Sequence, residues 1–428
     1  MRTADRPLPA SITLDAGALA TWPVRPVIAI EQRPVAPYVW DDGTVWDAAG
    51  AVWDAANAMP AFVDATCDFT GCDIEFDGPD DQLNFPAGHL TLTLDNRSGR
   101  WARYNVDGTP TDYGVGQQVW VWADEKAGPG AWWLFAGRIA RWDERADDTI
   151  EIEAFDFLTD LAQPVGTFTP GAAAEQPGAR LTAISALAAV VLLRTRYAAG
   201  TVALTRQATE RAPLEEMQTV AGSDGGVLYG DADGTVVYAD RTWRVGRSDQ
   251  PAVPVVGTNV CAAPLVLHDP VLSTTDTALA TTVVLENVAG LKATATKGTG
   301  PYVLAAQDQQ WTTQPEGDTL AAALVAQTWQ PRLGIDTADV YLMDPAQPAA
   351  LGAVDWRRGD RIRVLHDSKT PTGVARVDIE ALIVSLAHAF TPDGWVLTFG
   401  TGRALAYYTP AVWDSGAVWD AAGQVWGY

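Results

Sequence analysis

The stretch HLTLTLDN, residues 89–96, alternates apolar and polar side chains along its length. Residues 118–124, QVWVWAD, and residues 149–156, TIEIEAFD, show the same alternation. A period of two residues places the apolar side chains on one face of a strand, so each stretch predicts a half-buried strand of an antiparallel sheet. Residues 132–144, WWLFAGRIARWDE, contribute two more predicted strands. We therefore expect residues 61–165 to form a compact antiparallel β domain, as a barrel or a sandwich.

The last part of the chain repeats these patterns in GDRIRVLHD, VDIEALIVSLAHAF and WVLTFGT. Apolar and glycine positions match between the two regions at an offset of 359 − 116 = 243, for Gly116, Val119 and Val121 against Gly359, Ile362 and Val364. One strand further on, Ile139 and Trp142 match Ile383 and Leu386 at an offset of 244. A near-constant offset across two strands and a turn predicts an internal duplication. We expect residues 251–405 to form a second, related β barrel, interrupted by a helix within GDTLAAALVAQTWQPR at 317–332.

Between the two β regions the pattern changes. Residues 179–195, ARLTAISALAAVVLLRT, carry apolar side chains near helical spacing, and residues 212–226 predict a second helix that ends at a glycine-rich stop. Residues 227–241, VLYGDADGTVVYADR, predict two strands around a turn. Residues 166–250 are thus expected to form a small α+β module, so that the fold is mainly β with an α+β insert.

A tryptophan repeat, VWD or VWG, occurs three times in residues 39–54 and three times in residues 412–427. In both segments the tryptophans are 6 and then 7 residues apart, at Trp40, Trp46 and Trp53 and at Trp413, Trp419 and Trp426. Asp-Gly and Ala-Gly between the VW pairs favour tight turns. We expect these repeats to lie in short arms outside the barrels, at residues 1–60 and 406–428.

Three interpretations of the tryptophan repeats stay open. The rings could pack on the barrels or on one another, or they could dock a partner protein, since aromatic anchors are typical of interface hot spots. They could also stack on sugar rings, as aromatic repeats of wall-binding modules do.

Charge and hydropathy exclude several classes of protein. The 428 residues include 29 basic and 53 acidic side chains, a formal net charge of −24. Such a surface repels phosphate groups, so we expect no sequence-specific nucleic-acid binding, although the charge suits a protein past which DNA must slide. No run of 18 apolar residues occurs and Met1-Arg2 leads into no apolar signal core, so we expect neither stable membrane insertion nor export by the N-terminus.

The sequence offers no catalytic, cofactor-binding or metal-binding constellation. No nucleophile elbow, phosphate loop or dinucleotide fingerprint occurs. None of the four histidines has the spacing of a metal ligand; they are His89, His268, His366 and His388. Asp231 and Asp233 in GDADG resemble the start of a calcium loop but lack its glutamate, which favours a plain hairpin turn. The cysteines form no framework, and Cys67 and Cys72 are interpreted as small half-buried thiols, with Cys261 alone elsewhere.

Several motifs, in their order along the chain, resemble the minor tail proteins of siphophages that form the tail-tip or baseplate hub, above all those of phages infecting actinobacteria. The resemblance covers roughly residues 60–405. It is carried by TLTLDNRSGRWARYNVDGTPTDYGVGQQVWVWAD, LFAGRIARWD, IEAFDFLTDLA, PLEEMQTVAGSDGGVLYGDADGTVVYADR, GDRIRVLHD and VSLAHAFTPDGWVLTFGT.

The resemblance implies a structural, non-enzymatic protein of the virion tail tip, assembled as a homotrimer. Two tube-like barrels in each subunit would then place six around the axis and match a hexameric tail tube. The implied partners are the distal tail protein, the end of the tape-measure protein and downstream fibre or receptor-binding proteins, with DNA passing through the lumen. Two rival functions are a wall-carbohydrate or receptor-binding protein that acts through its tryptophan repeats, and a wall-degrading tail-tip enzyme.

Overall fold

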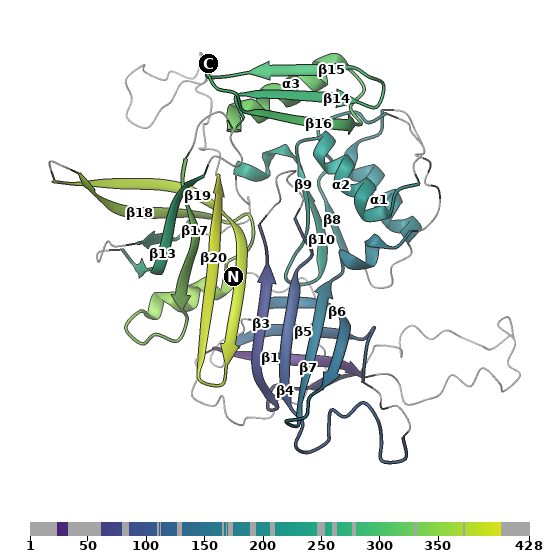
Figure 1. Ribbon diagram of the computed structural model, residues 1–428, viewed down its shortest axis with the longest axis vertical. Helices are drawn as coiled ribbons and strands as arrows, with labels where there is room; N and C mark the ends of the chain where they lie inside the picture. The colour runs from purple at the N-terminus through teal and green to yellow at the C-terminus, as the bar shows by residue number, and fades with distance from the viewer. Residues whose placement is uncertain are drawn as a thin grey trace, which may run out of the picture.

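The computed structural model is mainly β and contains three sheets, one of 14 strands and two of three strands (Figure 1). It describes residues 24–32, 61–78, 85–108, 111, 113–125, 131–164, 167, 169, 174–188, 194–205, 210–245, 253–258, 263–275, 280–328, 332–370 and 373–403. Both tryptophan-repeat segments lie outside these residues. Among the described helices, none has the length and apolar character needed to span a membrane.

The first half of the large sheet is an antiparallel array in the order β3-β4-β7-β6-β5-β1-β2. Its strands are β1 (Val24–Gln32), β2 (Ala61–Asp64), β3 (Phe69–Phe76), β4 (His89–Asp95), β5 (Gln118–Glu125), β6 (Ala131–Glu144) and β7 (Thr149–Asp156), followed by the short helix η1 (Thr159–Ala162). The three strands predicted from alternation are confirmed as β4, β5 and β7. The segment expected to supply two strands is instead one strand of 14 residues, β6, with a bulge between Ile139 and Arg141.

The second half repeats this arrangement, with the order β13-β17-β20-β19-β18 corresponding to β3-β4-β7-β6-β5. Its elements are β11 (Val255–Gly257), β12 (Leu265–Val266), β13 (His268–Thr275), β17 (Arg332–Tyr341), η3 (Pro348–Asp355), β18 (Arg361–Thr370), β19 (Gly373–Thr391) and β20 (Gly394–Arg403). The two short strands β12 and β11 extend the sheet beyond β18.

The correspondence extends to single hydrogen bonds. The amide of Gly116 donates to the carbonyl of Ile139, and the amide of Gly359 donates to the carbonyl of Ile383, each at 2.8 Å. Both glycines adopt positive φ, 89° and 83°, which glycine tolerates without the steric cost of a Cβ atom. A bulge follows each isoleucine, after Ile139 and after Ile383. The duplication inferred from the sequence is therefore also present in the structure, in the glycine turn, the strand register and the bulge.

The two halves are not separate closed barrels, which corrects the expected architecture. Strand β19 is 19 residues long and has three neighbours: β18, β20 and β3. One edge of β19 pairs with β18 through its first half and with β3 through its second half, from Leu386 opposite Phe76 to Phe390 opposite Cys72. This edge joins the two arrays, and the pairings among the described strands give an open path without closure.

Two smaller units lie beside the large sheet (Figure 1). The first contains α1 (Pro177–Ala188), β8 (Arg194–Tyr197), α2 (Pro213–Ser223), β9 (Val227–Gly230), β10 (Thr235–Ala239) and η2 (Arg241–Val245), which match the predicted module except that α1 ends at Ala188 and Arg194 begins a strand. The second contains β14 (Thr282–Asn287), β15 (Lys292–Thr296), β16 (Val303–Gln309) and α3 (Gln314–Thr328). The sequence predicted the helix of this second unit, but it did not predict that the unit has a sheet separate from the large one.

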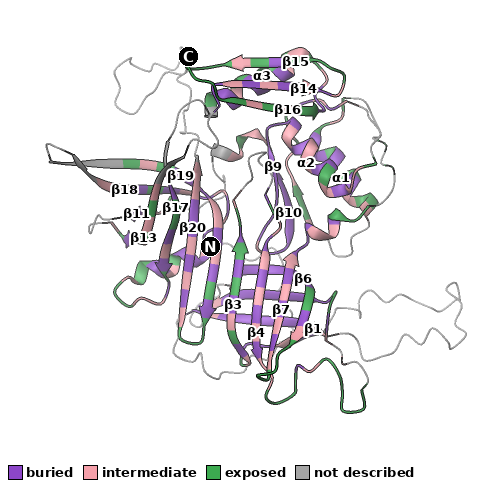
Figure 2. Cartoon of the chain, viewed as in Figure 1, coloured by how far each residue is buried: buried purple, intermediate pink, exposed green. Residues whose placement is uncertain are grey.

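The main hydrophobic core runs through both halves of the large sheet (Figure 2). Phe69 of the first half and Phe390 of the second half meet edge to face, with ring centroids 5.7 Å apart, and Phe390 also contacts Trp395. A separate cluster lies on β1, β2, β5 and β6 of the large sheet, and others belong to the smaller units, where Trp311 is fully buried and packs with α3.

A buried histidine at the junction of the halves makes stability depend on pH. His388 is opposite Ile74 of β3, and its Nδ1 accepts a hydrogen bond from Trp395 Nε1 at 3.3 Å. Burial lowers the pKa of His388 from 6.5 to about 4, so the unfolded chain binds a proton more readily than the folded chain between these values. The stability contributed by neutral His388 is therefore lost as pH falls below about 6.5.

We expect His388→Gln, whose amide oxygen can accept the Trp395 bond, to remove this pH dependence. Relative to pH 7, the wild-type chain should lose about 2 kcal/mol more unfolding free energy at pH 5 than the variant loses. Urea denaturation of both proteins at the two pH values measures the difference, in which other titrating groups cancel. Parallel losses in the two proteins would show that His388 does not titrate in this way.

Candidate functional site

The six tryptophans predicted to bind partners, Trp40, Trp46, Trp53, Trp413, Trp419 and Trp426, lie outside the described residues, so their role stays a prediction. Most of the described tryptophans are core residues. Trp101, Trp311 and Trp395 are at most 1% exposed, and Trp101 donates from Nε1 to Asp68 at 2.9 Å. Most of the described tryptophans therefore have an architectural role, apart from any role of the two repeats.

The GDADG stretch forms the hairpin turn between β9 and β10, as predicted. The amide of Asp231 donates to the carbonyl of Thr235 at 2.8 Å, and Asp233 Oδ1 accepts the amide of Thr235 at 2.9 Å. The carboxylate of Asp231 faces two arginines, Arg196 at 2.9 Å and Arg357 at 3.6 Å. Its oxygens are thus occupied by cationic side chains and by the turn.

The other candidate ligands are dispersed. Within the described ranges, no three side chains of the His, Cys, Asp and Glu types gather as metal ligands would. Cys67 is exposed and Cys72 is buried, both as free thiols, and burial raises the pKa of Cys72 well above its usual range. His366 Nδ1 lies 2.8 Å from the hydroxyl of Thr258, and His268 Nε2 lies 3.0 Å from the amide nitrogen of Gln347.

A deeply buried ionic cluster lies where three parts of the chain meet. Arg358, which precedes β18, is 5% exposed, and its guanidinium stands over three aromatic rings at 4.8–5.3 Å from their centroids, those of Phe76, Phe85 and Tyr229. Cation–π contacts of this kind are strongest when water is excluded. Arg358 Nη2 also donates to the carbonyl of Gly230 at the end of β9. One side chain from the second half thus contacts both the first half and the middle module.

Asp156, the last residue of β7, is the carboxylate of this cluster. It is 1% exposed and accepts the amides of Gly88 at 2.7 Å and Leu158 at 2.9 Å. Burial raises its pKa to about 6, although the two backbone hydrogen bonds and the charge of Arg358 act in the opposite direction. Burial likewise lowers the pKa of Arg358. Desolvation is the larger effect on both groups, as expected for charges held away from water.

Gly230 allows the Asp156 carboxylate to lie close to the backbone of β9. A Cβ atom at this position would lie 2.2 Å from Asp156 Oδ2, far inside a van der Waals contact. The central joint, defined here as Asp156, Gly230, Asp231 and Arg358, therefore depends on the close approach of a carboxylate to backbone. It sets how the middle module sits on the two halves of the large sheet.

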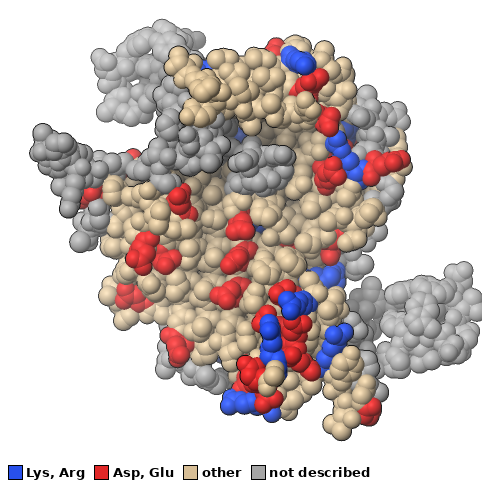
Figure 3. Space-filling model, viewed as in Figure 1, with Lys and Arg blue, Asp and Glu red and all other residues tan. Residues whose placement is uncertain are grey.

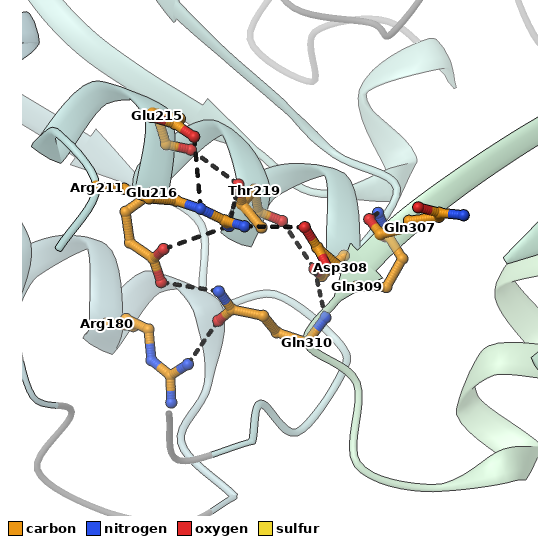
Figure 4. A network of polar contacts seen from close by, with 10 residues as sticks. Arg180, Arg211, Glu215, Glu216, Thr219, Gln307, Asp308, Gln309 and Gln310 are labelled. Carbon is orange, nitrogen blue, oxygen red and sulfur yellow. Dashed lines mark hydrogen bonds and ion pairs between the residues drawn. The ribbon is translucent and has the colours of Figure 1, made fainter. Parts of the chain in front are cut away.

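A second polar network connects the middle module to the β14–β16 unit (Figure 4). Gln310 is at its centre: its side chain accepts from Arg180 Nη1 at 2.7 Å and donates to Glu216 Oε1 at 2.8 Å. The amide of Gln310 donates to the hydroxyl of Ser223 at 2.8 Å. Arg180 is fully buried and also bonds Glu175 at 3.0 Å. Because these partners are buried, the network specifies a single docked arrangement of the two units.

The exposed face of the large sheet is rich in carboxylates and threonines. One row runs across the junction of the halves as Ala389, Asp73, Thr91, Glu153 and Arg141. Arg141 pairs with Glu153 at 3.2 Å, and Arg145 pairs with Glu151 at 2.5 Å. Figure 3 shows acidic side chains across this view and a mixed cluster of both charges at its lower end. On β3, β4, β7 and β6 this row is therefore polar, and it meets the second half at Ala389.

Sequence reasoning did not identify either buried network. The central joint combines Asp156, Gly230 and Arg358, which are more than 70 residues apart and follow no motif spacing. The one local signal was an arginine pair, Arg357-Arg358, directly before the turn glycine Gly359. A pair of charges beside a turn ordinarily indicates solvent exposure, and here one of the two is buried.

We expect Gly230→Ala to lower the free energy of unfolding by about 2–3 kcal/mol, because the added methyl group overpacks against the Asp156 carboxylate. The matched control is Gly222→Ala in α2, where a Cβ atom meets nothing within 4 Å and alanine favours the helix. Chemical denaturation at pH 7 compares the two variants. Equal stability of both variants would contradict a tightly packed central joint.

A scan against protein-family models and a search of curated proteins find no match to this chain. Among solved structures, the tail protein from Neisseria meningitidis MC58 is similar, with a TM-score of 0.56 at 11% identity, over 89% of this chain and 96% of that chain. The 43 kDa tail protein of prophage MuSo2 from Shewanella oneidensis has a TM-score of 0.51 at 15% identity, over 80% of this chain and 94% of that chain. At such low identity the likeness concerns the fold, and over nearly their whole length this chain shares the fold of these tail proteins.

Proposed function

We propose that this chain is a structural protein of a phage virion, a trimeric hub at the tail tip. The observation that carries the proposal is the strand order β3-β4-β7-β6-β5, which recurs as β13-β17-β20-β19-β18 in a chain with the fold of tail proteins. Three chains with two repeats each supply six similar units around an axis. Such a ring matches the sixfold symmetry of a tail tube to a threefold tip.

The charge of the chain supports a place beside the DNA path. The formal charge is −24, and the exposed face of the large sheet carries Asp73 and Glu75 beside the ion pairs Arg141–Glu153 and Arg145–Glu151. An acidic wall repels the DNA backbone and prevents adhesion during passage. We propose that this face lines the exit channel of the hub.

The proposed neighbours are the distal tail protein, the end of the tape-measure protein and the downstream tip or fibre proteins of a siphophage of the actinobacterial type. The tryptophan repeats at residues 39–54 and 412–427 are the proposed docking elements for them. The alternative is that the repeats bind cell-wall carbohydrate. In either case the chain works by contact, and we propose no catalytic step.

The hub proposal predicts a particle with three times the 45.6 kDa mass of one chain, located at the tip of the tail. Mass photometry of the purified protein and electron microscopy of assembled tails test the two parts. A ring of six subunits, or a location on a side fibre, would refute the hub.

The docking role of the repeats predicts that Trp413→Ala/Trp419→Ala weakens binding to tail-tip proteins while retention on host cell walls is unaffected. Truncating two aromatic anchors should lower the binding affinity about tenfold or more. Pulldown with cell walls and with tail-tip proteins, using wild type and the double variant, separates the two functions. Loss of wall retention in the variant would favour the carbohydrate-binding alternative.

A further inference from the structure

The duplicated array presents the same strand edges twice, but the chain itself joins only one pair of them. In that pair, residues Leu386–Phe390 of β19 lie antiparallel to residues Cys72–Phe76 of β3. In the other repeat, β6 corresponds to β19, and in the second half β13 corresponds to β3. If neighbouring chains pair as the two repeats of one chain do, the strands that meet between chains are β6 and β13.

The relevant edge of β6 is open among the described strands. Along this edge β5 pairs with β6 as far as Arg138, and Ile139 is bonded by Gly116 and Gln117. The next residues, Trp142–Glu144, correspond to Leu386–His388 at the offset of 244 and pair with β7 alone. They thus correspond to the part of β19 that pairs with β3.

The outer edge of β13 is open in the same sense. Within the described part of the chain β13 pairs with β17 alone, whereas β3 pairs with both β4 and β19. Val271 of β13, which corresponds to Asp73 of β3, is 52% exposed, unusual for a valine in a strand. Pro270 removes one amide donor at the start of this edge, and the residues after it keep theirs.

The two open edges lie on opposite sides of the molecule. In Figure 1, β13 lies on the left of the large sheet and β6 on the right, with the β20, β19, β3, β4 and β7 strands between them. Edges on opposite sides of one subunit suit a head-to-tail contact, which generates a closed ring when the rotation per subunit permits.

We propose that β6 of one copy of this chain pairs antiparallel with β13 of the next copy, repeating between chains the β19–β3 pairing within the chain. The proposal rests on the ring put forward under "Proposed function" and names the strands that form its subunit contact. The large sheet then continues across every subunit boundary.

A second copy fits these edges better than an unrelated strand because the chain already contains the same contact. In the intrachain version, β19 and β3 meet in antiparallel register, and aromatic side chains pack behind them, Phe69 against Phe390. Each free edge also carries backbone groups that an added strand would satisfy. The interchain pairing extends an arrangement that this fold already uses.

The test places a charge on the β13 edge. In the repeated register Asp73 lies opposite Ala389, so Val271 would lie opposite residue 389 − 244 = 145, which is Arg145. Val271→Arg introduces a guanidinium opposite Arg145, and like charges across a strand pair destabilise it. We expect ring formation to weaken about tenfold or more by mass photometry, with the monomer still folded by circular dichroism. The matched control is Val303→Arg, also on an edge strand and 60% exposed, in β16 outside the large sheet.

A charge reversal on the partner edge identifies the contact. Adding Arg145→Glu to Val271→Arg should restore the ring, because opposite charges then meet. A trimer that survives Val271→Arg, or one that dissociates and is not restored by Arg145→Glu, would overturn the β6–β13 pairing while leaving the hub intact. A wild-type chain that forms no ring would instead count against the hub and the pairing together.

Discussion

The antiparallel pairing of β19 with β3 is the contact on which the rest of the structure depends. It occurs between strands about 315 residues apart in sequence, and it turns two repeated arrays into one sheet of 14 strands. Strand β19 is long enough for one edge to pair with both β18 and β3. The part of this edge that could have closed the second array pairs with the first array instead. The result is one sheet that continues through both arrays without closing among the described strands.

Two buried polar clusters then determine how the smaller units sit on this sheet. The central joint of Asp156, Gly230, Asp231 and Arg358 holds a charge among aromatic rings, and the network around Gln310 holds the β14–β16 unit on α2. Buried charges contribute less to net stability than their number suggests, since desolvation offsets attraction. Their effect here is geometric, because removing one partner would leave another buried and unpaired.

Repetition is also what connects the fold to the proposed function. A single chain that presents two copies of one array can act as two positions of a ring. The counterparts of the edges that meet inside the chain, on β6 and β13, are open among the described strands. In such an assembly the exposed face that carries Asp73, Glu75 and Glu153 would be repeated around the axis, and contact rather than chemistry would be the work of the protein.

The sequence by itself determined the local elements and the duplication. Alternation identified β4, β5 and β7, helical spacing identified α1, α2 and α3, and the 243–244 offset located matching turns at Gly116 and Gly359, because all of these depend on residues close together in the chain. Tertiary structure alone decided that the arrays join through β3 and β19, that residues 280–328 form a separate unit, and that Arg358 is buried. The physical reason is that strand edges carry the same backbone donors and acceptors whatever their sequence. Which edges meet, and which charges lose their water, is settled by the packing of segments hundreds of residues apart.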